Sequence, residues 1–179
     1  ASVPGMLLSP ILAKKIGKRN CLILFNVMRA AFTVLMFFTS GNPVIFLGSF
    51  YFATLAVGGD AVISASMTAD IFDYQQWKTG QRLEGFITQF GGMMVSGIGL
   101  ATGLILPYFY RYYGLHNDYN VLFDEAVRGP IFNVMIIVTV ISCILAVVPI
   151  LFYDLSAKQL DTIAKELEER KAESEELKD

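Results

Sequence analysis

The most informative part of the chain is residues 67–85, MTADIFDYQQWKTGQRLEG. It lies between two apolar segments that are each long enough to cross a bilayer. It contains three acids, two bases, a tyrosine and the only tryptophan: Asp70, Asp73, Glu84, Lys78, Arg82, Tyr74 and Trp77. We predict an ordered, charged loop at one surface of a membrane protein. Its density of charge indicates a moving hinge or gate rather than a simple tether.

The composition indicates a membrane protein. Hydrophobic residues make up 54% of the chain and charged residues 17%, whereas a soluble domain has about 25% charged residues. A spanning helix needs roughly 20 apolar residues. We therefore expect an all-α membrane protein with four complete transmembrane helices and the end of a fifth. The predicted helices cover about residues 1–13, 21–38, 44–67, 85–110 and 130–153.

The basic residues predict how these helices are oriented. Eleven of the fourteen Lys and Arg residues lie in the first and third loops and in the tail. Cytoplasmic loops are enriched in these residues. We expect a multi-pass protein of the cell membrane (a plasma membrane or a bacterial inner membrane) with its C-terminus in the cytoplasm. The transmembrane part would span residues 1–153, followed by a cytoplasmic amphipathic helix and acidic tail over 154–179.

No pattern in the chain indicates an enzyme. Cys21 and Cys143 lie in apolar segments and suit packing, and the single histidine, His116, has no cysteine nearby. We find no metal-ligand spacing, no glycine-rich phosphate loop and no nucleophile motif. We expect no catalytic residue, no metal site, no bound cofactor and no nucleic-acid partner.

Two charged residues fall within predicted spans. Arg29 is ten residues past Arg19, and Asp60 is ten before Asp70, so both lie at similar depth on consecutive antiparallel helices. Ionisable groups inside a membrane are costly and commonly functional. We predict that Arg29 and Asp60 pair or line one polar cavity. The alternative is that Arg29 extends to the interface and Asp60 is protonated or faces water.

The predicted helix over residues 85–110 is rich in glycine. Small residues four apart let membrane helices approach closely, a spacing met by Gly92 with Ser96 and by Gly99 with Gly103. The pattern fits either static packing or a smooth face that rocks against its neighbours, as transporters require.

The tail has a different composition. Ser156 and Gln159 have the spacing of a capping box. Leu160, Ile163 and Leu167 form a narrow apolar stripe at helical spacing. We expect a short helix with a frayed acidic end after Glu168. Either it is solvated and has no function, or it binds a cytosolic partner.

Two motifs resemble a known family. KKIGKR (residues 14–19) resembles the basic inter-helix loop of the major facilitator superfamily. The pattern D-x-x-D-Y-x-x-W-K-x-G-x-R-x-E-G (residues 70–85) is similar to the loop between helices ten and eleven of the glycoside–pentoside–hexuronide:cation symporters. The resemblance to this melibiose-permease-like family covers the whole chain. It implies the C-terminal part of a twelve-helix major-facilitator fold.

The resemblance implies symport of a sugar, glycoside or hexuronide with Na⁺ or H⁺ by alternating access. The coupling ion would bind mainly outside this fragment. The partners would be the lipid bilayer, the sugar and the missing N-terminal bundle of the same chain. Alternatives are a major-facilitator transporter of a non-sugar or amphiphilic solute, or a non-transporting membrane scaffold or sensor.

The resemblance also implies roles for the charged stretch. A cytoplasmic charge network would hold the two bundles together in the outward-open state, with aromatic anchors at the interface: Asp70, Asp73, Arg82 and Glu84 with Tyr74 and Trp77. The alternative is that these charges merely cap two helix ends.

One position departs from the family pattern. Many members have a lysine fourteen residues after the loop arginine, where this chain has Ser96. The remaining candidates for polar contact with a solute on this helix are Gln89 and Ser96.

Overall fold

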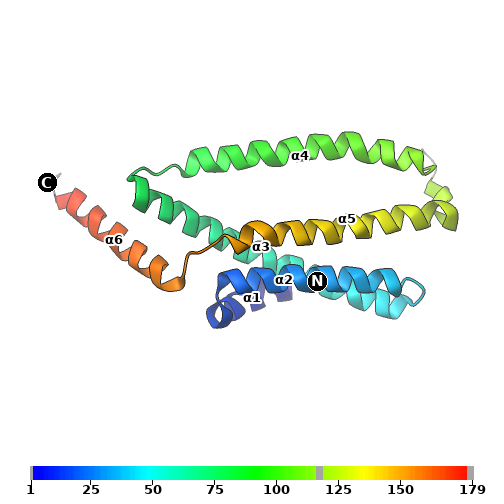
Figure 1. Ribbon diagram of the computed structural model, residues 1–179, viewed down its shortest axis with the longest axis horizontal. Helices are drawn as coiled ribbons and strands as arrows, with labels where there is room; N and C mark the ends of the chain where they lie inside the picture. Colours follow the sequence, from blue (N-terminus) through cyan, green and yellow to red (C-terminus); the bar gives the residue numbers. More distant parts are fainter. Residues whose placement is uncertain (1, 116–118, 177–179) are drawn as a thin grey trace.

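The computed structural model describes residues 2–115 and 119–176, so His116 and residues 177–179 lie outside the described part. Helices joined by short connections make up the described chain (Figure 1). They are α1 (Ser2–Ile16), α2 (Lys18–Phe38), α3 (Pro43–Thr79), α4 (Glu84–Tyr112), the 3₁₀ helix η1 (Tyr119–Phe123), α5 (Glu125–Leu151) and α6 (Ala157–Glu176).

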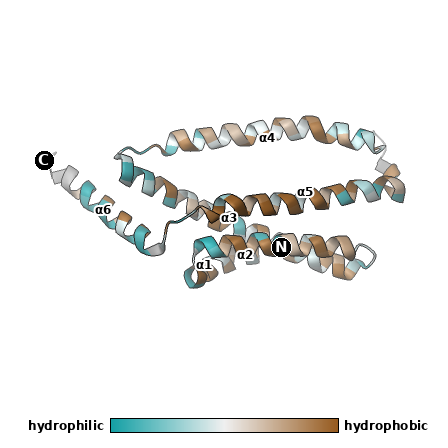
Figure 2. Ribbon diagram, viewed as in Figure 1, coloured by the Kyte–Doolittle hydropathy of each residue, from teal (hydrophilic) through white to brown (hydrophobic). Residues whose placement is uncertain are grey.

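Four of these helices, α2, α3, α4 and α5, are long and apolar enough to cross a membrane. The predicted all-α fold class with four such helices is confirmed. Figure 2 shows apolar residues along α2 and α5, while polar residues gather on α6 and the C-terminal part of α3. The polar ends of these helices therefore mark one boundary of the membrane-spanning part.

The core lies where α1, α2 and α3 pack together and α5 covers α2. Its buried side chains include Cys21, Phe25, Ala56 and Ile63. Cys21 and Cys143 are both free and buried. The core is thus built mainly from the first three helices.

Glycines allow the backbone of α1 to lie directly against the backbone of α3. A Cβ built on Gly58 would lie 2.1 Å from the carbonyl oxygen of Ser2, and one on Gly5 would lie 1.9 Å from that of Leu55. Any side chain at either position would collide with backbone. The chain therefore requires glycine here, whereas the glycines of α4 have no neighbour within 4 Å of such a Cβ.

The predicted loop over residues 67–85 is wrong, because most of it is helical. Between Asp60 and Thr79 the sequence has neither glycine nor proline, so nothing interrupts α3. The helix ends at Gly80, whose φ of 70° is the left-handed conformation that glycine adopts at helix C-termini. Only residues 80–83 form the connection to α4.

The length of α3 follows from this correction. Its 37 residues would span about 55 Å at 1.5 Å per residue, well beyond the ~30 Å hydrocarbon core. Asn42 caps its other end by accepting hydrogen bonds from the N–H groups of Val44 and Ile45. The last turns of α3 therefore extend past the membrane and present its charged side chains there.

Helix α5 also differs from its predicted bounds. It begins at Glu125 rather than residue 130, because Asp124 accepts a hydrogen bond from the N–H of Ala126 and so caps the helix. Pro130 lies inside it.

Helix α4 has no buried residue, and Figure 1 shows it apart from the other helices along its length.

Candidate functional site: a polar cluster at the C-terminal end of α3

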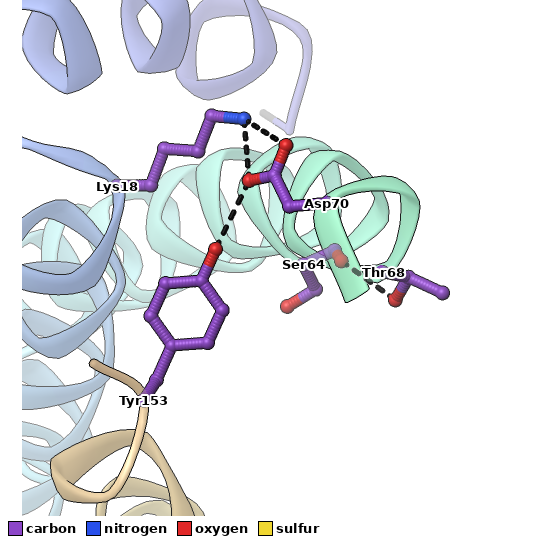
Figure 3. Close-up of polar contacts among 5 residues, drawn as sticks. All are labelled: Lys18, Ser64, Thr68, Asp70 and Tyr153. Atoms are coloured by element: carbon purple, nitrogen blue, oxygen red, sulfur yellow. Dashed lines mark hydrogen bonds and ion pairs between the residues drawn. The ribbon is translucent and has the colours of Figure 1, made fainter. Parts of the chain in front are cut away.

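Asp70 is the centre of the cluster. Its carboxylate accepts hydrogen bonds from the Lys18 ammonium at 2.6 and 2.8 Å, and from the Tyr153 hydroxyl at 3.0 Å (Figure 3). Lys18 opens α2, and Tyr153 lies just after α5. One carboxylate therefore connects the ends of three elements.

The pair is partly shielded from water. The side chain of Asp70 is 14% exposed and that of Lys18 32%. Burial and the adjacent Asp70 carboxylate raise the pKa of Tyr153, so its phenol stays protonated at neutral pH and remains a donor. A partly buried, fully hydrogen-bonded pair is worth more than an exposed one.

Arg19 adds a second connection at the same end. Its guanidinium donates a hydrogen bond of 2.8 Å to the carbonyl oxygen of Leu151, the last residue of α5. Cations satisfy the free carbonyls and the negative dipole at a helix C-terminus. The two neighbouring bases of KKIGKR thus hold α3 and α5 respectively.

Trp77 connects α3 to α6. Its indole N–H donates to the Glu166 carboxylate at 2.5 Å, and Arg170 donates to the Trp77 carbonyl oxygen at 3.1 Å. The Tyr74 ring lies 6.0 Å from that of Trp77, and the Lys78 ammonium lies 5.8 Å from the Tyr74 ring centre. The aromatic pair therefore serves a helix–helix contact in this structure.

Helix α6 is anchored at its start and along its apolar stripe. The predicted capping box is confirmed: the Gln159 side chain accepts from the Ser156 N–H at 2.9 Å, and the Gln159 N–H donates to Ser156 Oγ at 3.3 Å. Ile163 and Leu167 are buried. The expected fraying after Glu168 is wrong, because α6 continues to Glu176.

The remaining predicted charges do not join the cluster. Arg82 and Glu84 pair with each other at 2.8 Å in the exposed α3–α4 connection. Asp73 is exposed, and its side chain has no hydrogen bond or ion pair in the described part of the chain. The structure therefore brings Asp70 and Trp77 into contacts between elements, but not Asp73, Arg82 or Glu84.

Arg29 and Asp60 do not form an ion pair within the described ranges. The buried Asn26 amide donates to Asp60 at 2.8 Å and to the carbonyl oxygen of Leu22 at 3.1 Å. Arg29 lines a cavity of about 310 Å³ between α2, α3 and α5, of which Asp60 is not a lining residue. The direct pairing we predicted is absent from this conformation, and Asn26 is the partner of Asp60.

Gln89 and Ser96 both lie exposed on α4. The Ser96 hydroxyl donates to the carbonyl oxygen of Gly92 at 2.9 Å, the usual bond of a serine within an apolar helix. Neither side chain is covered by another helix in the described part of the chain. Among the described residues, no group of His, Cys, Asp and Glu could hold a metal ion.

Sequence reasoning identified part of the cluster. The charged stretch predicts a role for Asp70 and Trp77, whereas the basic loop that contains Lys18 predicts only the orientation of the helices. Asn26, Tyr153 and Glu166 carried no signal, because none lies in a motif. The resemblance to the basic KKIGKR loop was the one clue that could have paired Lys18 with an acid.

Comparison with known proteins identifies the class. The model of the MFS/sugar transport protein family matches residues 2–157. The chain therefore belongs to this family of multi-pass membrane transporters. No solved structure matches the chain.

Three curated relatives are similar to this chain. The chain is 35% identical to an isoprimeverose transporter of Lactiplantibacillus pentosus over 57% of this chain and 22% of the relative. It is 26% identical to a putative sulfoquinovose importer of Escherichia coli K12, over 93% of this chain and 36% of the relative. A putative 2,3-dihydroxypropane-1-sulfonate exporter of Salmonella typhimurium is 27% identical over the same shares. The chain spans about a third or less of the length of these relatives.

Proposed function

We propose that the chain is the C-terminal part of a glycoside–pentoside–hexuronide:cation symporter that moves a sugar, glycoside or hexuronide by alternating access. The family match over residues 2–157 supports transport, and the motif over residues 70–85 supports this subfamily. The coupling ion, Na⁺ or H⁺, binds mainly to residues outside this chain. Two of the similar relatives are named as carriers of sugars or sugar derivatives.

The cluster around Asp70 acts as a cytoplasmic gate in this proposal. The observation that carries it is the contact of Asp70 with both Lys18 and Tyr153, which ties three element ends at one side of the bundle. Partly buried pairs can bias two conformations by about 1–3 kcal/mol, more than exposed pairs do. The cluster would hold the cytoplasmic parts of α2, α3 and α5 in the arrangement against which the other bundle closes in the outward-open state. Asp73, Arg82 and Glu84 would pair across to the other bundle.

The solute path lies along α4 and the intramembrane polar groups. Gln89 and Ser96 are exposed there and offer hydrogen bonds to a sugar hydroxyl. Asp60 with Asn26, and Arg29 in its cavity, supply polar groups within the membrane. Such groups commonly mark a solute or ion pathway.

The test is uptake by the full-length transporter in proteoliposomes. Labelled glycosides would be offered with an inward Na⁺ gradient, an inward H⁺ gradient, or neither. We expect accumulation with one gradient and only equilibration when both are collapsed. Accumulation that survives collapse of both gradients would overturn symport, and absence of any exchange across a panel of glycosides would favour the scaffold alternative.

A second candidate solute is a sulfonate anion. Two relatives are named for sulfonates, sulfoquinovose and 2,3-dihydroxypropane-1-sulfonate. An anionic solute would suit Arg29, the only base within the predicted spans. In the same proteoliposomes, stronger competition by a sulfonated three-carbon solute than by any neutral glycoside would favour this candidate.

A further inference from the structure

A cavity of about 850 Å³ lies beside the Asp70 cluster. Its walls come from the end of α1, the start of α2, the adjoining part of α3 and the Tyr153–Leu160 connection into α6. Much of the wall is apolar and includes Pro10, Val62, Leu155 and Leu160. A volume of this order suits an organic molecule rather than a small ion.

The rim of the cavity is basic. Lys14, Lys18 and Arg19 all line it, and the one acid on its lining is Asp154. Lys18 and Arg19 are engaged with Asp70 and the Leu151 carbonyl oxygen. Lys14 is exposed and has no ion pair or hydrogen bond to the described chain. The Lys14 ammonium is therefore available to a ligand, on a rim where basic side chains outnumber acidic ones.

The depth of the cavity matches a lipid headgroup. Arg19 reaches the last residue of the transmembrane helix α5, so the basic rim lies at the membrane boundary while the wall at Val62 lies on the spanning helix α3. An apolar wall below a basic rim is complementary to a molecule with an acyl chain and an anionic head. Basic pockets between transmembrane helices recognise anionic phospholipids in this way.

We propose that this cavity binds one anionic phospholipid, with its phosphodiester at Lys14 and its glycerol and first methylenes against the apolar wall. Bound there, the lipid contacts α1, α2, α3 and the segment before α6, next to the Lys18–Asp70 pair. The bound lipid would stabilise the packing of these helices around the Lys18–Asp70 pair. The proposal rests on the chain spanning the membrane and not on the identity of the transported solute.

The test is native mass spectrometry of the full-length transporter with phosphatidylglycerol or phosphatidylcholine of identical acyl chains. We expect one tightly retained phosphatidylglycerol and no equivalent phosphatidylcholine. Lys14→Gln should lower its apparent affinity about fivefold, since one base near an anionic headgroup contributes about that factor. The matched control is Lys15→Gln on the same turn, because Lys15 is exposed but does not line the cavity.

A second variant tests the place of binding without changing charge. Ser66 lines the cavity, and Ser66→Phe should place a phenyl ring where the acyl chain would lie and abolish retention. Equal losses in the Lys14 and Lys15 variants, equal retention of both lipids, or full retention in Ser66→Phe would each overturn the proposal. Displacement of the lipid by millimolar inorganic phosphate would assign the cavity to a soluble anion instead. Each outcome is read without a transport assay, so failure here is distinguishable from failure of the symport proposal.

Discussion

At the scale of single residues, Asp70 is the side chain with the most connections between elements. Its two oxygens accept three hydrogen bonds, two from Lys18 of α2 and one from Tyr153, two residues after α5. Removing one partner of a partly buried pair leaves the other charge without compensation. A substitution at Asp70 should therefore weaken the packing of α2 and α5 against α3 more than substitution of any exposed acid nearby.

Asp70→Asn in the full-length transporter should slow initial solute uptake about tenfold. The neutral amide keeps the shape but removes the ion pair, and a loss of about 1–2 kcal/mol corresponds to roughly that factor. Glu168→Gln is the control, because the exposed carboxylate of Glu168 on α6 has no hydrogen bond or ion pair in the described part of the chain and no role in the proposed gate. Similar uptake by both variants would contradict a specific role for Asp70.

At the scale of elements, α6 is held by its cap, its stripe and Trp77. Ser156→Ala removes a capping side chain and should destabilise the first turn of α6 by about 1 kcal/mol. Amide hydrogen exchange in that turn should be several-fold faster. Thr162→Ala is the control, since its hydroxyl bonds only the Lys158 carbonyl oxygen; if it accelerated exchange equally, the cap would have no special role.

The α1–α3 contact depends on glycine rather than on apolar side chains. Gly58→Ala places a methyl group 2.1 Å from the Ser2 carbonyl oxygen, so backbone must move, at a cost of about 1–3 kcal/mol. We expect a lower thermal unfolding temperature in detergent. Gly48→Ala, on the same helix with nothing within 4 Å, should leave that temperature unchanged or raise it.

At the scale of the whole molecule, antiparallel helices put alternate connections on opposite sides of the membrane. We predict that a cysteine at Gly41, between α2 and α3, reacts with an impermeant maleimide applied outside intact cells. A cysteine at Gln81, between α3 and α4, should react only after permeabilisation. The native Cys21 and Cys143 are buried and would be replaced by alanine. The reverse labelling pattern would invert the proposed orientation.

The whole molecule also explains why the charged stretch is a helix rather than the predicted loop. Residues 67–79 have the density of charge that is typical of a loop. They are nevertheless helical, because α3 continues past the apolar region and ends only at its C-cap, Gly80. Charge density marks the boundary of the membrane, since charged groups avoid lipid, but it does not end a helix. A glycine in the left-handed conformation does.

The membrane class, the four spanning helices, the capping box and the family motif can all be predicted from the sequence. They depend on hydropathy, on spacing and on residue identity along the chain. The pairing of distant groups is visible only in the folded chain: Asp70 meets Lys18, 52 residues away, and Trp77 meets Glu166, 89 residues away. Such contacts depend on how helices pack, and many arrangements of the same helices satisfy one hydropathy pattern. The partners of Asp70, the amide beside Asp60 and the basic cavity thus emerge from packing alone.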